Sequence, residues 1–204
     1  MADFEAHIRK RIEESRRVKE ALLEGDHVRL MAQVAEWSVE TYRRQGKLLL
    51  FGNGGSAADA QHIATELVGR YYLERAPLAA LALHTDTSLL TAVANDSSFD
   101  NVFARQVEAL ATAADLAIGI STSGNSENVI RAIQAAHAKG CRTVGLTGRS
   151  GGRLKEIADC CICVPSGDTP RIQEAHILIG HIMCELVEQQ MFFPAETLDH
   201  ARKK

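Results

Sequence analysis

Apolar residues follow two different spacings along this chain, and the change between them falls near residue 45. Before that point apolar side chains recur every three or four positions, as they do on one face of a helix. Gly25 and Asp26 interrupt this pattern, and Asp26 can cap the helix that follows. The first part of the chain therefore predicts two helices, which together form an N-terminal helical extension over residues 1–45.

Beyond residue 46, five short apolar runs alternate with segments of helical character. The runs are residues 47–51, 78–83, 116–120, 143–146 and 160–164. The helical segments are 57–68, 87–94 with 102–110, 127–139, 152–157 and 171–190. The alternation predicts an α/β fold, doubly wound, with a mostly parallel five-stranded sheet flanked by helices. Because the gaps are short, we expect one domain over residues 1–204.

Charge and composition exclude several classes of protein. The formal net charge is −3, and no cluster of Lys and Arg is dense enough for direct nucleic-acid binding. No apolar stretch approaches the roughly 20 residues that a membrane span needs, and the polar N-terminus is unlike a signal peptide. The five cysteines are an odd number, and the spacing of Cys160, Cys161 and Cys163 fits no common zinc pattern. We interpret the cysteines as reduced and the protein as cytoplasmic.

Two strand ends carry loops suited to an anion. Residues 52–56 read Gly-Asn-Gly-Gly-Ser and residues 121–126 read Ser-Thr-Ser-Gly-Asn-Ser, and each loop leads into a predicted helix. The free N–H groups of a helix N-terminus attract an anion, and the hydroxyl groups add further donors. Neither loop is a dinucleotide fingerprint or a P-loop. Either loop alone could be an ordinary turn with a capping serine, but two at one sheet edge favour a phosphate site.

Three further side chains are candidates for metal binding or proton transfer. His62 and Glu66 are four residues apart on one helix face, where they can bind a metal, form an acid–base pair, or simply be an exposed pair. On the last helix, Gln173 and His181 are separated by a rise of roughly 12 Å, so one ion can hardly be reached by both. Gln173 then either lies at a frayed helix start or contacts the substrate. His176 points elsewhere and is interpreted as structural or interfacial.

Several motifs together resemble one known family. They are Gly-Asn-Gly-Gly-Ser at 52–56, His62-x-x-x-Glu66 followed by Gly69-Arg70-Tyr71, Asn95-Asp96, the run from Ile120 to Ser126, Leu146-Thr-Gly148, and Arg171-Ile-Gln-Glu-x-His176 with His181. In these positions the chain resembles the phosphoheptose isomerases of the sugar isomerase (SIS) family. The resemblance covers nearly the whole chain, and the combination is specific because many SIS domains share only the serine loop.

The resemblance implies an aldose–ketose isomerase that converts sedoheptulose 7-phosphate to D-glycero-D-manno-heptose 7-phosphate, the first step of ADP-heptose synthesis for lipopolysaccharide core or other surface glycans. It also implies a homotetramer with active sites between subunits and one zinc ion per subunit. The matching metal ligands are His62, Glu66, Gln173 and His181, of which Glu66 and His181 match the acid–base residues. The matching substrate contacts are Asn53, Gly54, Gly55, Ser56, Glu66, Asn95, Asp96, Ser121, Thr122, Ser123, Ser126 and Gln173.

Two alternatives remain open at this stage. The chain also resembles the initiator-associating proteins, which share the fold and bind the replication initiator without catalysis, in residues 83–86, 90–95 and 192–194. That group lacks equivalents of Glu66 and His181, which this chain keeps, so we favour the enzyme. The other alternative is a SIS isomerase that acts on a hexose or pentose phosphate.

The position of His181 leads to one more expectation. It lies two turns inside the last helix, away from the sheet edge where Glu66 is expected. We therefore expect His181 to act on Glu66 across a subunit boundary, with the apolar stripe Ile177, Gly180, Cys184 and Val187 packing between chains. The alternative is that this stripe is the core face of the helix within one chain.

Overall fold

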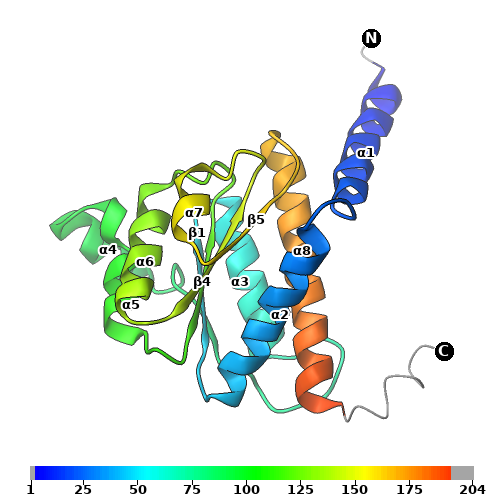
Figure 1. The fold of residues 1–204 in the computed structure, drawn as a ribbon. Coiled ribbons are helices and arrows are strands. Elements are labelled where there is room, and N and C mark those ends of the chain that lie inside the picture. Colours follow the sequence, from blue (N-terminus) through cyan, green and yellow to red (C-terminus); the bar gives the residue numbers. More distant parts are fainter. Residues whose placement is uncertain (1–2, 194–204) are drawn as a thin grey trace.

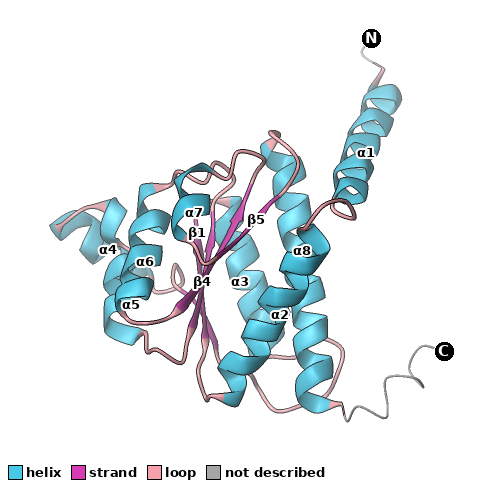
Figure 2. Cartoon of the chain, in the orientation of Figure 1, coloured by secondary structure: helices cyan, strands magenta, loops and turns pink. Residues whose placement is uncertain are grey.

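Five parallel strands form the centre of the molecule. A computed structural model describes residues 3–193. The strands are β1 (Leu48–Gly52), β2 (Ala80–Ala82), β3 (Leu116–Ile120), β4 (Arg142–Thr147) and β5 (Cys160–Cys163). Their order is β2-β1-β3-β4-β5, and every pairing is parallel. Figure 2 shows the strands in magenta between the helices. The predicted five-stranded doubly wound sheet is therefore confirmed. The order changes direction between β1 and β3, and ligands of such folds bind at that point.

Helices cover both faces of the sheet (Figure 1). Strand side chains alternate between the faces, so Leu48 and Leu50 join one core while Leu49 and Phe51 join the other. The first core contains residues of α2 (His27–Arg43), α3 (Gly55–Val68) and α8 (Thr169–Phe192). The second contains residues of α5 (Ala104–Leu110), α6 (Glu127–Ala138) and α7 (Gly152–Ile157), with α4 (Thr87–Asp96) and the short 3₁₀ helix η1 (Phe99–Asn101) beside them.

The two predicted N-terminal helices are present. The first, α1 (Phe4–Ala21), extends away from the sheet, contains no buried residue, and exposes the apolar side chains of Phe4, Ile8 and Ile12 (Figure 1). No helix in residues 3–193 has the length and apolar character that a bilayer crossing requires. The end of the 192–194 motif and the basic residues 202–204 lie outside the described part of the chain.

The expectation about the α8 stripe is wrong. Gly180 packs against α3 of the same chain so closely that a Cβ there would lie 2.6 Å from Cδ1 of Ile63. Cys184 and Val187 belong to the same core cluster as the strands. The stripe is therefore the core face of α8, and Gly180 brings the two helices together within one subunit.

Candidate active site

The two loops predicted to bind an anion meet at the carboxyl edge of the sheet. Asn53, after β1, exchanges two side-chain hydrogen bonds of 2.9 Å with Asn128 in the first turn of α6. Asn128 is buried, so this amide pair fixes the glycine loop relative to the serine loop. The one sequence signal for Asn128 is its place two residues after the loop that ends at Ser126, and that signal is too weak to predict its role. Ser56 is buried in the first turn of α3.

Hydroxyl groups gather inside the serine loop. The Oγ atom of Ser121 lies 2.9 Å from Oγ of Ser126 and 3.4 Å from Oγ of Ser123. Ser126 occupies the N-cap position of α6, but its side chain makes no capping hydrogen bond. Ser126 therefore does not act as an ordinary capping serine, which was the alternative explanation for this loop. The hydroxyls and the free N–H groups of α6 form a group of donors suited to a phosphate.

A turn between β4 and α7 supports the serine loop from behind. Gly148 donates a backbone hydrogen bond of 3.0 Å to the carbonyl of Thr122, and Leu154 donates one of 2.9 Å to that of Gly124. Gly124 adopts φ +68°, and a Cβ there would lie 1.9 Å from the carbonyl oxygen of Gly151. No side chain fits at this position, so the two segments are in direct backbone contact.

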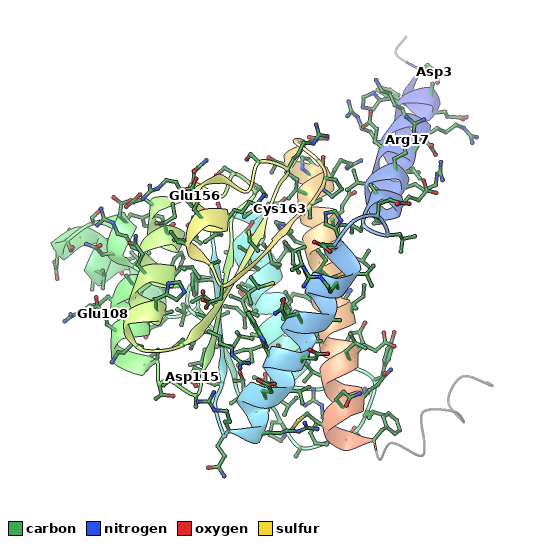
Figure 3. The ribbon with its side chains drawn as sticks, in the orientation of Figure 1. Asp3, Arg17, Glu108, Asp115, Glu156 and Cys163 are labelled. Atoms are coloured by element: carbon green, nitrogen blue, oxygen red, sulfur yellow. The ribbon has the colours of Figure 1, made fainter. Side chains whose placement is uncertain are left out.

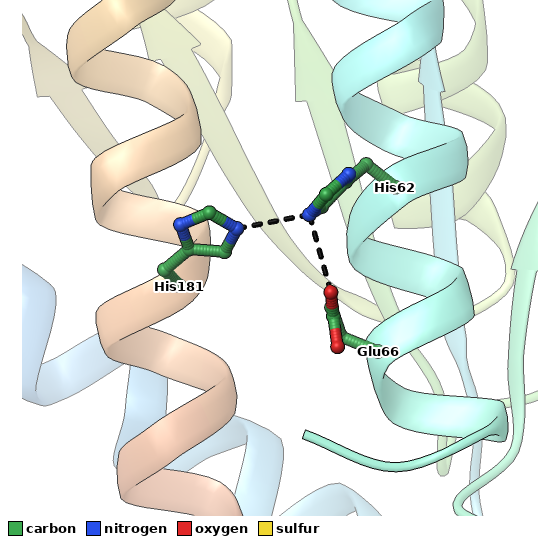
Figure 4. A group of neighbouring side chains, drawn as sticks. All are labelled: His62, Glu66 and His181. Atoms are coloured by element: carbon green, nitrogen blue, oxygen red, sulfur yellow. Dashed lines mark hydrogen bonds and ion pairs between the residues drawn. The ribbon is translucent and has the colours of Figure 1, made fainter. Parts of the chain in front are cut away.

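His62, Glu66 and His181 converge beside α3 (Figure 4). The Nε2 atom of His62 lies 2.9 Å from Nε2 of His181 and 3.2 Å from Oε1 of Glu66. All three side chains come from one chain, which corrects the expectation that His181 reaches Glu66 across a subunit boundary. The physical reason is the close packing of α3 and α8 at Gly180. One oxygen of Glu66 faces His62, and the other is directed away from it.

This cluster has the chemistry of a divalent metal site. The three ligand atoms lie within 4.8 Å of one another. Two imidazole nitrogens and one carboxylate oxygen form a donor set that catalytic zinc uses, with a fourth position open. The two facing ring nitrogens can satisfy each other only if one carries a proton, whereas a cation accepts the lone pairs of both. The residues therefore fit a zinc ion.

Gln173 lies at the other end of the α3–α8 contact. A Cβ on Gly55 would be 2.5 Å from the Nε2 atom of the Gln173 side chain, so the amide lies directly against the first turn of α3. His62 is two turns further along that helix, a rise of roughly 10 Å. The amide therefore lies beside the glycine loop, which agrees with the alternative that Gln173 contacts the substrate. Its roles as a substrate contact and as a metal ligand stay predictions.

A buried ion pair holds the segment that follows α3. Glu188 of α8 accepts hydrogen bonds from the backbone N–H groups of Tyr71, Tyr72 and Leu73 and from Nε of Arg75. Arg75 also donates to the carbonyl oxygen of Glu66 at 2.9 Å. Both charged side chains are only 2% exposed. Sequence reasoning missed this pair because its members are 113 residues apart.

One aromatic residue and one acidic residue lie next to the cluster of His62, Glu66 and His181. The ring of Tyr71 lies 5.8 Å from that of His181, and burial raises the pKa of Tyr71 to about 12, so its phenol stays protonated. Asp59 is one turn before His62 on the same helix. Burial raises the pKa of its carboxyl to about 6, and Oδ2 has no hydrogen-bond partner in the described part of the chain. The spacing 59, 62, 66 was the signal for Asp59 that sequence analysis did not use.

The remaining predicted residues have other positions. Asn95 donates to Asp96 at 2.8 Å, and both are exposed at the end of α4, on the opposite face of the sheet from α3. The structure therefore does not bring them to the His62 cluster within one chain, and their role as substrate contacts stays a prediction. His176 is fully buried, with Nε2 3.1 Å from the carbonyl of Thr147, which agrees with its structural interpretation.

Comparison with known proteins identifies the class that this fold and site define. The SIS domain family matches residues 12–148, so the molecule is a SIS domain protein. It is 56% identical over 178 residues to the phosphoheptose isomerase of Pelobacter propionicus, covering 87% of this chain and 94% of that protein. It is 52% identical over 187 residues to that of Aneurinibacillus thermoaerophilus, covering 91% and 94%. The chain therefore belongs to the phosphoheptose isomerases of the SIS domain family.

Solved structures agree with this assignment. The phosphoheptose isomerase of Neisseria gonorrhoeae superposes with a TM-score of 0.86 at 44% identity, over 91% of this chain and 99% of that chain. The phosphoheptose isomerase of Francisella tularensis gives a TM-score of 0.88 at 36% identity, over 93% and 100%. The predicted enzyme class is confirmed.

Proposed function

We propose that this enzyme converts sedoheptulose 7-phosphate to D-glycero-D-manno-heptose 7-phosphate at the carboxyl edge of its sheet. The observation that carries the proposal is the convergence of His62, Glu66 and His181 beside the helix that begins at the glycine loop. The serine loop provides the phosphate anchor at the same edge. Binding energy from the phosphate is remote from the reacting carbons and helps to orient them.

Glu66 and His181 are the proposed acid–base residues. The reaction removes a proton from C1 of the ketose and returns it to C2, while a second proton moves from the oxygen on C1 to the oxygen on C2. A carboxylate oxygen of Glu66 takes and returns the carbon-bound proton, and an imidazole nitrogen of His181 carries the proton between the two oxygens. The 2.9 Å contact with His62 holds a ring nitrogen of His181 within 4.8 Å of a carboxylate oxygen of Glu66.

His62, Glu66 and His181 are the residues that would hold a zinc ion, and Gln173 contacts the substrate or completes the ligand set. When bound, the ion supplies a Lewis acid for the two substrate oxygens. With one atom of each residue given to the ion, the second oxygen of Glu66 and the second ring nitrogen of His181 would be the groups left for the two proton transfers. We place the sugar phosphate against the glycine loop and the serine loop. Its further contacts there would be Asn53, Gly54, Gly55 and Thr122.

The wider setting is also part of the proposal. We place the enzyme in the cytoplasm because all five cysteines are free thiols, as is typical of a reducing compartment. We propose one SIS domain over residues 1–204, assembled as a homotetramer, because α1 exposes three apolar side chains that another subunit can cover. Its product would feed the synthesis of ADP-heptose for surface glycans.

Substitution of Glu66 by glutamine tests the mechanism. We expect kcat for sedoheptulose 7-phosphate to fall by at least about 10²-fold, the usual scale for a general base. Glu108→Gln is the matched control, because Glu108 is exposed on α5. Size-exclusion chromatography and circular dichroism establish that both variants are folded. A folded Glu66→Gln enzyme with near-normal kcat would show that another group removes the proton.

A further inference from the structure

Two thiols outside the active site form a close pair on β5. Cys161 and Cys163 are two residues apart on a strand and therefore share one face of the sheet. Their Sγ atoms are 3.8 Å apart, and both residues are partly exposed. The hydroxyl of Thr147 donates to Sγ of Cys163 at 3.3 Å and lies 3.7 Å from Sγ of Cys161. Figure 3 labels Cys163 on this strand, which is the last in the strand order and pairs with β4.

The surroundings make the two thiols unequal. Hydrogen bonds from the Cys161 thiol and from Thr147, with the nearby charges of Lys155 and His27, lower the pKa of Cys163. The hydrogen bond that Cys161 gives to Cys163, together with burial, raises the pKa of Cys161. Burial likewise raises the pKa of the other three cysteines. Cys163 is therefore the thiol most easily converted to a nucleophilic thiolate, with a protonated thiol beside it.

The pair also contacts the turn that supports the serine loop. Sγ of Cys163 lies 3.1 Å from where a Cβ on Gly151 would be. Gly151 is in turn in backbone contact with Gly124 of the serine loop. Because these groups are in direct contact, a displacement of Cys163 would move Gly151 and, through it, the serine loop.

We propose that Cys161 and Cys163 are a peroxide-reactive thiol pair that controls the phosphate loop. The Cys163 thiolate attacks the O–O bond of a hydroperoxide and becomes a sulfenic acid, and the alkoxide or hydroxide that leaves takes up a proton. The Cys161 sulfur then attacks the Cys163 sulfur, and a disulfide forms as water leaves. The two thiols lose two electrons, and the hydroperoxide gains them.

The geometry predicts a disulfide that is readily reduced. Residues i and i+2 of a strand have Cα atoms about 6.6 Å apart, at the upper limit of the range that disulfides span. β5 must pucker to close the bond, which an edge strand can do, and strained disulfides have more oxidising potentials. Closure draws Cys163 away from Thr147 and Gly151. The effect on substrate affinity rests on the proposed function, whereas the thiol chemistry does not.

Mass spectrometry of the native protein tests the chemistry. With hydrogen peroxide, the wild-type chain should lose two hydrogens and gain a Cys161–Cys163 cross-linked peptide, and dithiothreitol should reverse both. Cys161→Ser should stop at a sulfenic acid that dimedone labels at Cys163, and Cys163→Ser should not form the cross-link. Cys141→Ser is the control, because a serine hydroxyl can keep the 3.1 Å bond from Cys141 to the Thr112 carbonyl. Labelling spread over other cysteines, or no cross-link, would overturn the proposal.

Two readouts test the coupling to the phosphate loop. Oxidation should raise KM for sedoheptulose 7-phosphate about fivefold, the equivalent of one weakened hydrogen bond, with a smaller change in kcat. It should also accelerate amide hydrogen exchange in residues 121–126, a readout that needs no turnover. A cross-link that changes neither quantity would overturn control of the loop. A reduced enzyme without isomerase activity would instead contradict the proposed function and leave the exchange measurement to decide the coupling.

Discussion

Removing one partner of the buried ion pair between Arg75 and Glu188 should destabilise the fold strongly, because the other charge is then left buried without its partner. Glu188→Gln removes the charge but keeps the size, so it leaves the guanidinium of Arg75 buried beside a neutral amide. The amide NH₂ of the new side chain also faces backbone N–H groups that now donate to the carboxylate. Breaking a buried pair by removing one partner costs about 3–5 kcal/mol. For a chain of this size, that corresponds to a fall in Tm of about 2–4 °C per kcal/mol.

Denaturant unfolding, followed by circular dichroism at one fixed protein concentration, measures this loss. Glu108→Gln is the matched control, because Glu108 and Arg105 form an exposed pair at 3.7 Å and an exposed pair is worth less than about 1 kcal/mol. If both variants lose the same small amount, the buried pair does not have the role that we assign to it.

The effect of the Arg75–Glu188 pair on stability should depend on pH, and the pKa of Glu188 gives the direction of that dependence. Burial alone would raise the pKa of Glu188, but the N–H donors of Leu73, Tyr72 and Tyr71 and the side chain of Arg75 outweigh it, so the folded pKa is lowered. A carboxyl group whose pKa is lowered by folding stabilises the folded state at pH values above its pKa in the unfolded chain. This stabilisation is lost as the pH falls through its pKa in the folded protein. The difference in stability between wild type and Glu188→Gln should therefore shrink in acid.

Three further predictions concern the loop, the core and the assembly. Alanine at all three serines of the 121–126 loop should raise KM for the sugar phosphate far more than for the unphosphorylated sugar; equal effects would show that the loop does not hold phosphate. Burial lowers the pKa of His176 to about 4 from 6.5, so wild-type stability should fall as the pH drops through that window, and His176→Gln should flatten the dependence in denaturant titrations. Mixed oligomers of Glu66→Gln and His181→Gln chains should stay inactive, because no subunit then carries both residues; recovered activity would mean a shared site.

The fold was largely predictable because the pattern of apolar residues changes period once and then alternates regularly. Each predicted helix and strand exists, and most ends agree within a few residues. The main difference is β2, which spans only Ala80–Ala82 of the predicted 78–83. The backbone N–H of Leu78 bonds to the carbonyl of Leu67 in α3 instead of to a strand, so β2 begins after Leu78. Such a contact depends on tertiary packing and has no local sequence signal.

The arrangement of the candidate site was predictable where its residues are close in sequence. His62 and Glu66 are one helical turn apart, and the serines share one loop, so local spacing placed them correctly. His181 is 119 residues from His62, and its distance from that residue depends on how closely α8 approaches α3. The absence of a side chain at Gly180 and the position of Ile63 set this approach. The sequence pattern predicted that Gly180 packs between chains, whereas it packs against Ile63 within one chain.

Spacing on α8 explains how one helix can serve both catalysis and stability. His181 and Glu188 are seven residues apart, about two helical turns, and so lie on nearly the same face. His181 meets His62 on α3, and Glu188 fixes Arg75, which donates to the backbone carbonyl of Glu66. The same helix therefore positions the proposed acid and, through Arg75, the backbone of the proposed base. Loss of Glu188 should consequently lower kcat as well as stability, because the distance between Glu66 and His181 depends on α3 and α8 remaining in register.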